Sequence, residues 1–264
     1  MKNILTAIIS LGGLGLIFGI LLSLAFKKFA VQTNPLEAKI LECLPGSNCG
    51  ACGFAGCQGF AEALTNMKAE PNSCVAGGQA VAEKISAVLG IDVKQIEDTA
   101  AFVACRAGNK QAAKKYIYKG IDNCQAAALL FSGDKACIYG CLGLGSCIGS
   151  CPFDAISLTS EGLAVIDSAR CKACKKCIKS CPRQLIKMVP RNQEVLIACN
   201  NKDRGKKAKE VCSIACIACK ICEKACPSQA ITMVENNAVI DFSKCNQCGI
   251  CIEKCPQKTI QKTK

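Results

Sequence analysis

Residues Cys147–Pro182 read CIGSCPFDAISLTSEGLAVIDSARCKACKKCIKSCP, and residues Cys222–Pro256 read CEKACPSQAITMVENNAVIDFSKCNQCGICIEKCP. The two stretches align with a difference of one residue in the connection. Both carry Cys-Pro, then Ala-Ile, then Ala-Val-Ile-Asp, and then CxxCxxCxxxCP. An internal repeat of this kind indicates one structural unit present twice. We predict that each copy folds as two short strand pairs and two short helices around two metal sites.

The composition favours bound metal over disulfides or hydrolytic catalysis. The 264 residues include 25 cysteines, an odd number, and no histidine or tryptophan. Most cysteines stand two to five residues from the next, a spacing typical of metal sites. Without histidine the chain lacks a common zinc ligand, the usual general base and any Ser-His or Cys-His nucleophile. Zinc ribbons are the alternative, but they lack paired halves and a proline after the last cysteine.

Four cysteine runs make up the second half of the chain: Cys137/Cys141/Cys147/Cys151, Cys171/Cys174/Cys177/Cys181, Cys216/Cys219/Cys222/Cys226 and Cys245/Cys248/Cys251/Cys255. Three have the spacing of bacterial ferredoxins, in which the fourth cysteine of a run ligates the other [4Fe-4S] cluster. Three thiolates on one tight loop reach three corners of a cubane, and the partner half supplies the fourth. We therefore predict four sites: Cys137/Cys141/Cys147/Cys181, Cys171/Cys174/Cys177/Cys151, Cys216/Cys219/Cys222/Cys255 and Cys245/Cys248/Cys251/Cys226.

A fifth site is predicted in the glycine-rich stretch that starts at Cys43, CLPGSNCGACGFAGC. Here Cys49, Cys52 and Cys57 are joined by Cys74 beyond a predicted helix. The intervening glycines tolerate positive φ and let backbone N–H groups approach sulfur, which stabilises an anionic cluster. The alternative is a mobile loop with a thioredoxin-like CxxC pair, but no βαβ pattern flanks it.

Five cysteines stay outside these five [4Fe-4S] sites: Cys43, Cys105, Cys124, Cys199 and Cys212. Cysteine behaves as a small hydrophobic residue when buried, so we interpret them as buried free thiols. The alternative is a sixth cluster bound by some of them.

The basic surplus of the chain does not indicate nucleic-acid binding. The formal charge is +13, from 33 basic and 20 acidic side chains. Metal-bound cysteines are thiolates, so five oxidised clusters of about −2 each would leave only about +3. A cluster of basic residues that surrounds one cysteine run is a candidate docking face for an acidic partner: Lys172, Lys175, Lys176, Lys179 and Arg183.

The N-terminus predicts a membrane anchor. Residues Asn3–Phe26 carry no charge and are long enough to span a bilayer. Lys27 and Lys28 follow at once, so the positive-inside rule places the bulk of the chain in the cytoplasm. A cleaved signal peptide is the alternative, but the apolar run is too long for one.

The predicted fold is therefore α+β, with an N-terminal transmembrane helix, a small helical iron–sulfur domain and two bacterial-type 2[4Fe-4S] ferredoxin-like modules. We place the anchor at 1–28, the helical iron–sulfur domain at 29–98 and a connecting segment at 99–136. The modules are placed at 137–190 and 212–264, with a basic linker at 191–211. Helices are predicted over Gln58–Met67 and Gln79–Leu89, a strand over Thr99–Ala104, and short helices after Asn109 and Asp122.

These motifs resemble the B subunit family of the Rnf complex, the ion-translocating ferredoxin:NAD oxidoreductase. An anchor helix precedes LPGSNCGACGFAGC and Cys74, followed by CIYGCLGLGSCIGSCPFDAI and ferredoxin-like modules, over nearly the whole chain. The resemblance implies a cytoplasmic iron–sulfur subunit of an enzyme complex in the cytoplasmic membrane. It would take electrons from reduced ferredoxin toward other subunits, where NAD reduction is coupled to Na⁺ or H⁺ export.

Two other functions fit parts of the sequence. An iron–sulfur subunit of another membrane oxidoreductase, such as a hydrogenase or dehydrogenase, would share the two modules but does not predict the Cys49–Cys74 loop beside an anchor. A structural zinc protein would share only the cysteines. Neither a soluble GxGxxG turn nor another nucleotide motif is present, so substrate chemistry is expected on partner subunits.

Overall fold

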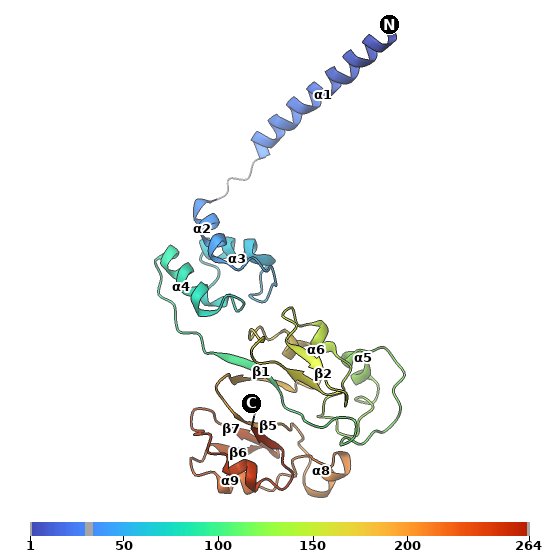
Figure 1. Cartoon of the computed structure of the whole chain (residues 1–264), viewed down its shortest axis with the longest axis vertical. Coiled ribbons are helices and arrows are strands. Elements are labelled where there is room, and N and C mark those ends of the chain that lie inside the picture. The colour runs from blue at the N-terminus through green and yellow to red at the C-terminus, as the bar shows by residue number, and fades with distance from the viewer. Residues whose placement is uncertain (1, 30–33, 263–264) are drawn as a thin grey trace.

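The computed structural model describes residues 2–29 and 34–262. Three parts of the predicted organisation lie outside this range: the first residue of the anchor, residues 30–33 of the segment that follows it, and the last two residues of the second module. Figure 1 shows three parts in chain order, a projecting helix, a helical unit and a larger body that carries the strands.

The projecting helix is α1 (Lys2–Phe29), whose last turn contains Lys27 and Lys28. Its segment Leu11–Lys28 has a mean hydropathy of 1.6 and none of it is buried against the rest of the protein. It is the one helix in the described residues long and apolar enough to cross a membrane. An apolar helix with no protein neighbour is compatible with insertion into a bilayer.

The helical unit comprises α2 (Pro35–Cys43), α3 (Gly56–Thr65), the 3₁₀ turn η1 (Pro71–Ser73) and α4 (Gly78–Leu89). The Asn34 side chain caps α2 by accepting a hydrogen bond from the Leu36 N–H. Gly90 ends α4 in the left-handed conformation, at φ +68, as its position after the apolar run predicts. The core of the unit joins Ile40, Phe60 and Ile85, so the three helices pack as one body.

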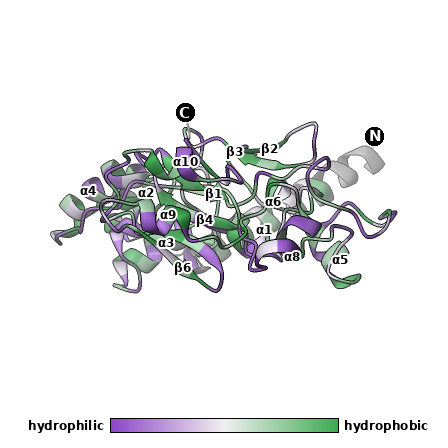
Figure 2. Cartoon of the chain, turned by 90° about the horizontal axis from the view of Figure 1, so that it is seen from below, coloured by the Kyte–Doolittle hydropathy of each residue, from purple (hydrophilic) through white to green (hydrophobic). Residues whose placement is uncertain are grey.

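The first module is built from two antiparallel strand pairs and two short helices. Strand β1 (Thr99–Val103) pairs with β4 (Ile186–Pro190), and β2 (Ile156–Leu158) pairs with β3 (Ala164–Ile166). Helices α6 (Ser146–Gly149) and α7 (Lys176–Ser180) lie between them in the chain. Strands β1 and β3 are coloured mainly as hydrophobic in Figure 2, and their small residues Ala100, Ala101 and Ala164 lie in the core.

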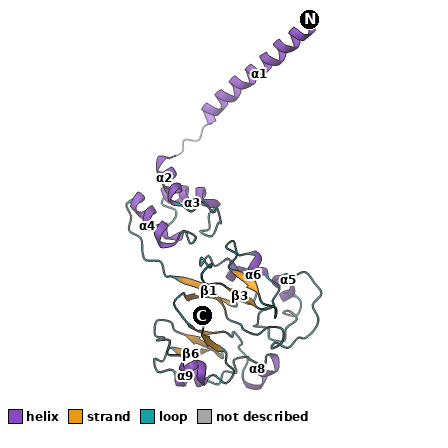
Figure 3. Cartoon of the chain, in the orientation of Figure 1, coloured by secondary structure: helices purple, strands orange, loops and turns teal. Residues whose placement is uncertain are grey.

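The second module repeats this order element by element. Strand β5 (Val195–Ile197) pairs with β8 (Ile260–Lys262), and β6 (Ile231–Val234) pairs with β7 (Asn237–Ile240). Helices α9 (Ile221–Ala225) and α10 (Ile250–Lys254) take the places of α6 and α7. In Figure 3 the strands are confined to this two-module body. Each copy thus has the strand pairs and helices that the repeat predicts.

The modules begin earlier in the chain than the sequence predicts. Strand β1 lies in 99–136, which we expected to be a connecting segment, and β5 lies in 191–211, which we expected to be a linker. The remaining helices are α5 (Cys124–Leu129) and α8 (Gly205–Val211). Asn123, not Asp122, caps α5, and residues 109–112 form turns and a bridge rather than the predicted helix.

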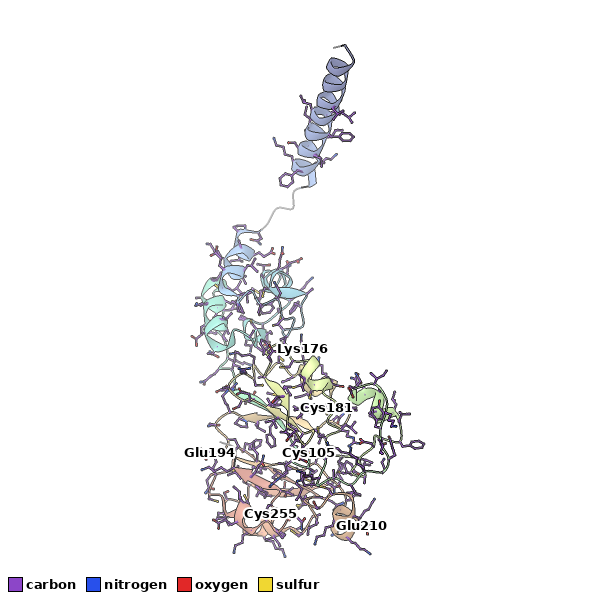
Figure 4. All side chains as sticks on the ribbon, turned by 45° about the vertical axis from the view of Figure 1, so that its right-hand side comes forward. Cys105, Lys176, Cys181, Glu194, Glu210 and Cys255 are labelled. Atoms are coloured by element: carbon purple, nitrogen blue, oxygen red, sulfur yellow. The ribbon has the colours of Figure 1, made fainter. Side chains whose placement is uncertain are left out.

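One lysine joins the helical unit to the first module. The Nζ of Lys176, at the start of α7, donates a 2.5 Å hydrogen bond to the Cys49 carbonyl oxygen. Figure 4 shows Lys176 where the two parts meet. Lys176 precedes Cys177, so the contact brings a predicted ligand loop of each part together.

Candidate metal centres

The Cys49–Cys74 loop folds around a cavity of about 300 Å³ lined by all four predicted thiols, those of Cys49, Cys52, Cys57 and Cys74. Gly50, Gly53 and Gly56 adopt φ values of +60, +93 and +84, which L side chains rarely adopt. Burial raises the pKa of the Cys74 thiol, and the three neighbouring thiols raise it further. These glycines therefore let the loop curve around the cavity, and Cys74, which directly follows η1, supplies the fourth thiol.

The second cysteine run of the first module meets its predicted partner. Burial raises the pKa of Cys177 to about 11, and its thiol neighbours Cys174, Cys171 and Cys151 add to the effect. The backbone N–H of Ala101 in β1 points at the Cys171 sulfur, 3.4 Å away. Cys151 comes from the other run, so the structure brings together the four cysteines that cross-pairing predicts.

The first run of this module is arranged differently from the prediction. A cavity of about 380 Å³ is lined by Cys141, Cys147 and Cys181, and the fourth thiol in it is Cys124 rather than Cys137. Burial raises the pKa of Cys147 to about 12, with Cys141, Cys124 and Cys181 as the neighbouring thiols. The Cys124 N–H donates a 2.7 Å hydrogen bond to Ser146 Oγ, which holds the start of α5 beside α6.

Cys137 lies instead in a separate cavity with three thiols that belong to none of the five predicted sites. That cavity, also about 380 Å³, is lined by Cys105, Cys137, Cys199 and Cys212, and Cys141 stands in the wall between the two cavities. Arg183, which we placed in a docking face, donates from Nη1 to the Cys137 carbonyl oxygen at 2.8 Å. Burial raises the pKa of Cys137 to about 11, with Cys105 and Cys212 among the thiols that raise it further.

The second module brings both of its predicted quartets together. Cys216, Cys219, Cys222 and Cys255 line a cavity of about 350 Å³. Burial raises the pKa of Cys251 to about 11, and the neighbouring thiols are Cys245, Cys248 and Cys226. Burial likewise raises the pKa of Cys222 to about 11. Each quartet again takes one thiol from the other run.

The donor sets fit iron–sulfur clusters. The four short helices α6, α7, α9 and α10, each with a cysteine of a quartet, begin after a residue in the left-handed conformation: Gly145, Lys175, Lys220 and Gly249. This turn aims consecutive N–H groups into the loop, an arrangement that binds anions. In the described residues no three His, Cys, Asp or Glu side chains converge as for one bound ion. The thiols instead line the walls of separate small pockets.

Comparison with known families and proteins agrees with this chemistry. Residues 44–76 match the family described as "Putative Fe-S cluster", and residues 215–259 match the "4Fe-4S dicluster domain" family. The chain is 43% identical to the B subunit of the ion-translocating oxidoreductase complex of Methanosarcina acetivorans, over 98% of both proteins. It is 40% identical to the B subunit of the Na(+)-translocating ferredoxin:NAD(+) oxidoreductase complex of Acetobacterium woodii, over 98% of this chain and 78% of that protein.

A third relative has the same designation. The B subunit of the proton-translocating ferredoxin:NAD(+) oxidoreductase complex of Clostridium ljungdahlii is 40% identical, over 99% of this chain and 93% of that protein. Because these three alignments span nearly the full chain, they include the anchor, the glycine-rich loop and both modules. The chain therefore belongs to the family of ion-translocating oxidoreductase complex B subunits, the Rnf family.

Proposed function

We propose that this chain is the membrane-anchored iron–sulfur subunit that accepts electrons from reduced ferredoxin in an ion-translocating ferredoxin:NAD oxidoreductase complex. The proposed ferredoxin and NAD specificity is taken from the names of two relatives. The two names differ in the translocated ion, which is Na⁺ in one and H⁺ in the other. The enzyme activity belongs to the complex, because this sequence has no nucleotide-binding motif of its own.

The observation that carries this proposal is the grouping of thiols into quartets. We propose five [4Fe-4S] ligand sets, which keep the predicted cysteines except that Cys124 replaces Cys137: Cys49/Cys52/Cys57/Cys74, Cys124/Cys141/Cys147/Cys181, Cys151/Cys171/Cys174/Cys177, Cys216/Cys219/Cys222/Cys255 and Cys226/Cys245/Cys248/Cys251. Such clusters supply one-electron transfer when bound.

The protein's own contribution is to bury the thiols and to direct donors at them. Burial alone would keep Cys147 and Cys177 neutral, because it raises the pKa of both thiols. Positive iron overcomes that penalty, so binding of iron and release of thiol protons are coupled. Backbone N–H groups such as that of Ala101 then stabilise the ligating sulfur and tune the site.

We propose a ferredoxin-docking face that is smaller than the sequence suggests. Of the five basic residues around the second run, Lys176 and Arg183 are engaged inside the protein by backbone carbonyl groups. Lys172, Lys175 and Lys179 are the three that remain for a partner, and Lys172 and Lys179 stand on either side of the Cys174–Cys177 turn. Cations beside this loop complement an acidic ferredoxin and would steer its approach.

The test uses the full chain purified without oxygen. We expect iron and sulfide in equal amounts, EPR signals of reduced [4Fe-4S] clusters, and reduction by ferredoxin that slows as salt is raised. Stoichiometric zinc without iron would refute the redox function, and salt-independent reduction would refute the docking face. Co-purification with hydrogenase or dehydrogenase subunits, rather than with an ion-translocating complex, would favour the alternative function.

A further inference from the structure

The cavity between the two modules is not explained by the five ligand sets. It holds four thiols that no other quartet uses, those of Cys105, Cys137, Cys199 and Cys212. Like the pocket of Cys124, Cys141, Cys147 and Cys181, it is small and lined by four thiols from different parts of the chain. Cys137 and Cys212 are 6% and 5% exposed, so the thiols face the protein interior. Figure 4 shows Cys105 between Cys181 of the first module and Cys255 of the second.

The four thiols come from equivalent places in the two modules. Cys105 stands two residues after the end of β1, in Val-Ala-Cys, and Cys199 stands two residues after the end of β5, in Ile-Ala-Cys. Cys137 stands four residues before Cys141, and Cys212 stands four residues before Cys216. The hydrogen bonds repeat as well: the Cys141 N–H donates to the Cys105 sulfur at 3.5 Å, and the Cys216 N–H to the Cys199 sulfur at 3.3 Å. Each module therefore supplies two thiols and one ligand-directed N–H to the shared cavity.

Two buried donors line this cavity without a partner. Lys135 and Asn201 are each 1% exposed. Among the described residues, Lys135 Nζ and Asn201 Nδ2 have no hydrogen-bond acceptor, and both residues line the cavity. A buried ammonium group without an anion is strongly unfavourable, whereas a buried amide without an acceptor loses a hydrogen bond. An anionic group inside the cavity would satisfy both donors at once.

We propose that Cys105, Cys137, Cys199 and Cys212 bind a sixth [4Fe-4S] cluster that joins the two modules. Four thiolates around an oxidised core make an anion of about −2, which matches the cation and the amide donor beside it. This assignment accounts for four of the residues left over or misplaced by spacing alone, and only Cys43 of the 25 cysteines stays outside a quartet. The interpretation of Cys105, Cys199 and Cys212 as buried free thiols is replaced by it.

The position of the site gives it a role in the proposed electron transfer, on which this part of the inference rests. Cys105 is one hydrogen bond from Cys141, and Cys199 is one hydrogen bond from Cys216. A centre held here accepts one electron from the first module and passes one electron to the second, or the reverse. The modules also touch through backbone bonds, such as Ser213 N–H to Gln111 O at 3.0 Å, so they form one body around the site.

The experiment is iron and sulfide analysis of the full-length protein, purified or reconstituted without oxygen. Six sites predict about 24 iron ions per chain, and Cys199→Ala should lower this by about four. Cys43→Ala is the matched control and should keep the wild-type value. About 20 iron ions in the wild type, unchanged in Cys199→Ala, would refute the sixth cluster and leave the proposed function standing. Absence of iron from the wild type would refute both, and zinc confined to this site would refute the cluster.

A second variant tests the site without removing a ligand. Lys135→Met keeps most of the length of the unbranched side chain and removes its charge. We expect the iron content to be unchanged and the reduction potential of one centre to fall, because a nearby cation stabilises the added electron. An EPR-monitored redox titration measures this. Unchanged potentials for every centre in Lys135→Met would show that the lysine does not face a cluster and would count against the site.

Discussion

Cys43 has surroundings unlike those of the other cysteines. Its sulfur donates to the Lys39 carbonyl oxygen at 3.3 Å within α2, and none of the thiol-lined cavities includes it. Cys74, by contrast, is 7% exposed and completes the quartet of the glycine-rich loop. The two residues lie in one helical unit, so they form a matched pair for substitution.

We predict that Cys74→Ala removes about four iron ions per chain, whereas Cys43→Ser removes none. The reason is that Cys74 is the proposed fourth ligand of the loop, whereas the Cys43 thiol is hydrogen-bonded to its own helix. Iron analysis of anaerobically purified variants provides the measurement. Equal iron in Cys74→Ala and wild type would contradict the fourth ligand of the loop.

A second prediction concerns Lys176 and its hydrogen bond to the glycine-rich loop. Its bond to the Cys49 carbonyl holds the glycine-rich loop against α7, so Lys176→Met should free that loop. Loss of one charge-assisted hydrogen bond of about 1.5 kcal/mol corresponds to roughly tenfold faster amide exchange in residues 49–57. Hydrogen exchange measured by mass spectrometry checks this. Lys179→Met is the control, since Lys179 lies exposed on the same helix, and equal exchange in both variants would disprove the link.

At this scale the sequence predicts which thiols lie together well where the spacing is regular and less well where it is not. Three runs have CxxCxxC spacing, and the structure groups their cysteines as predicted. In the first run five residues separate Cys141 from Cys147, and the thiol that completes their quartet comes from Cys124 at the start of α5. The sequence signal for this arrangement is the CxxxC pattern that starts at Cys137 and at Cys212, together with Val-Ala-Cys and Ile-Ala-Cys at the end of the first strand of each module.

At the scale of elements, the loop that precedes α6 depends on its contact with the β2–β3 hairpin. Gly143 adopts φ +78, and a Cβ there would overlap the carbonyl oxygen of Gly162 in the hairpin turn. Because backbone cannot move aside as a side chain can, Gly143→Ala should destabilise the module by about 1–3 kcal/mol. Thermal unfolding of the iron-loaded protein measures this, with Gly149→Ala as control because its Cβ would meet nothing within 4 Å. Equal melting temperatures would contradict the packing argument.

The elements themselves were only partly predictable. Gly90 stops α4 where a glycine after an apolar run should, because the left-handed cap is a local property. The pairing of β1 with β4 is not local, since Ala101 faces Met188 across a separation that spans most of the module. Neither strand has a strong sequence pattern of its own. Only the internal repeat of the whole unit indicates that β5 and β8 pair in the same way.

At the scale of the whole molecule, α1 makes no contribution to the cores described above, because Leu11–Lys28 is unburied. We predict that a chain starting at residue 34 is recovered in the aqueous fraction with the iron content of the full chain. The packing of Ile40, Phe60 and Ile85 begins after that residue. Partition between membrane and aqueous fractions, with iron analysis of both, is the measurement. Loss of iron from the shortened chain would show that the helix supports the fold.

The two-module body should depend on its metals for folding. Its strands contain three to five residues, and the largest fully buried side chains of the described chain include few aromatics. Metal binding supplies folding free energy in such small domains. Removal of iron by a chelator under reducing conditions should therefore abolish the dispersed amide spectrum of residues 99–262. A metal-free protein that retains native dispersion would contradict this.

The hydrogen bonds of the Cys141 and Cys216 amides to the sulfurs of Cys105 and Cys199 have an electrostatic consequence. In the proposed six-cluster arrangement they bring neighbouring clusters so close that an electron added to one would raise the energy of adding another beside it. Electron uptake by the chain would then be anticooperative, in the way that closely spaced acids titrate as a group and not as individuals. A redox titration of the chain would extend over a wider range of potential than a one-electron Nernst curve. The chain would take up its electrons one after another, each at a lower potential than the one before.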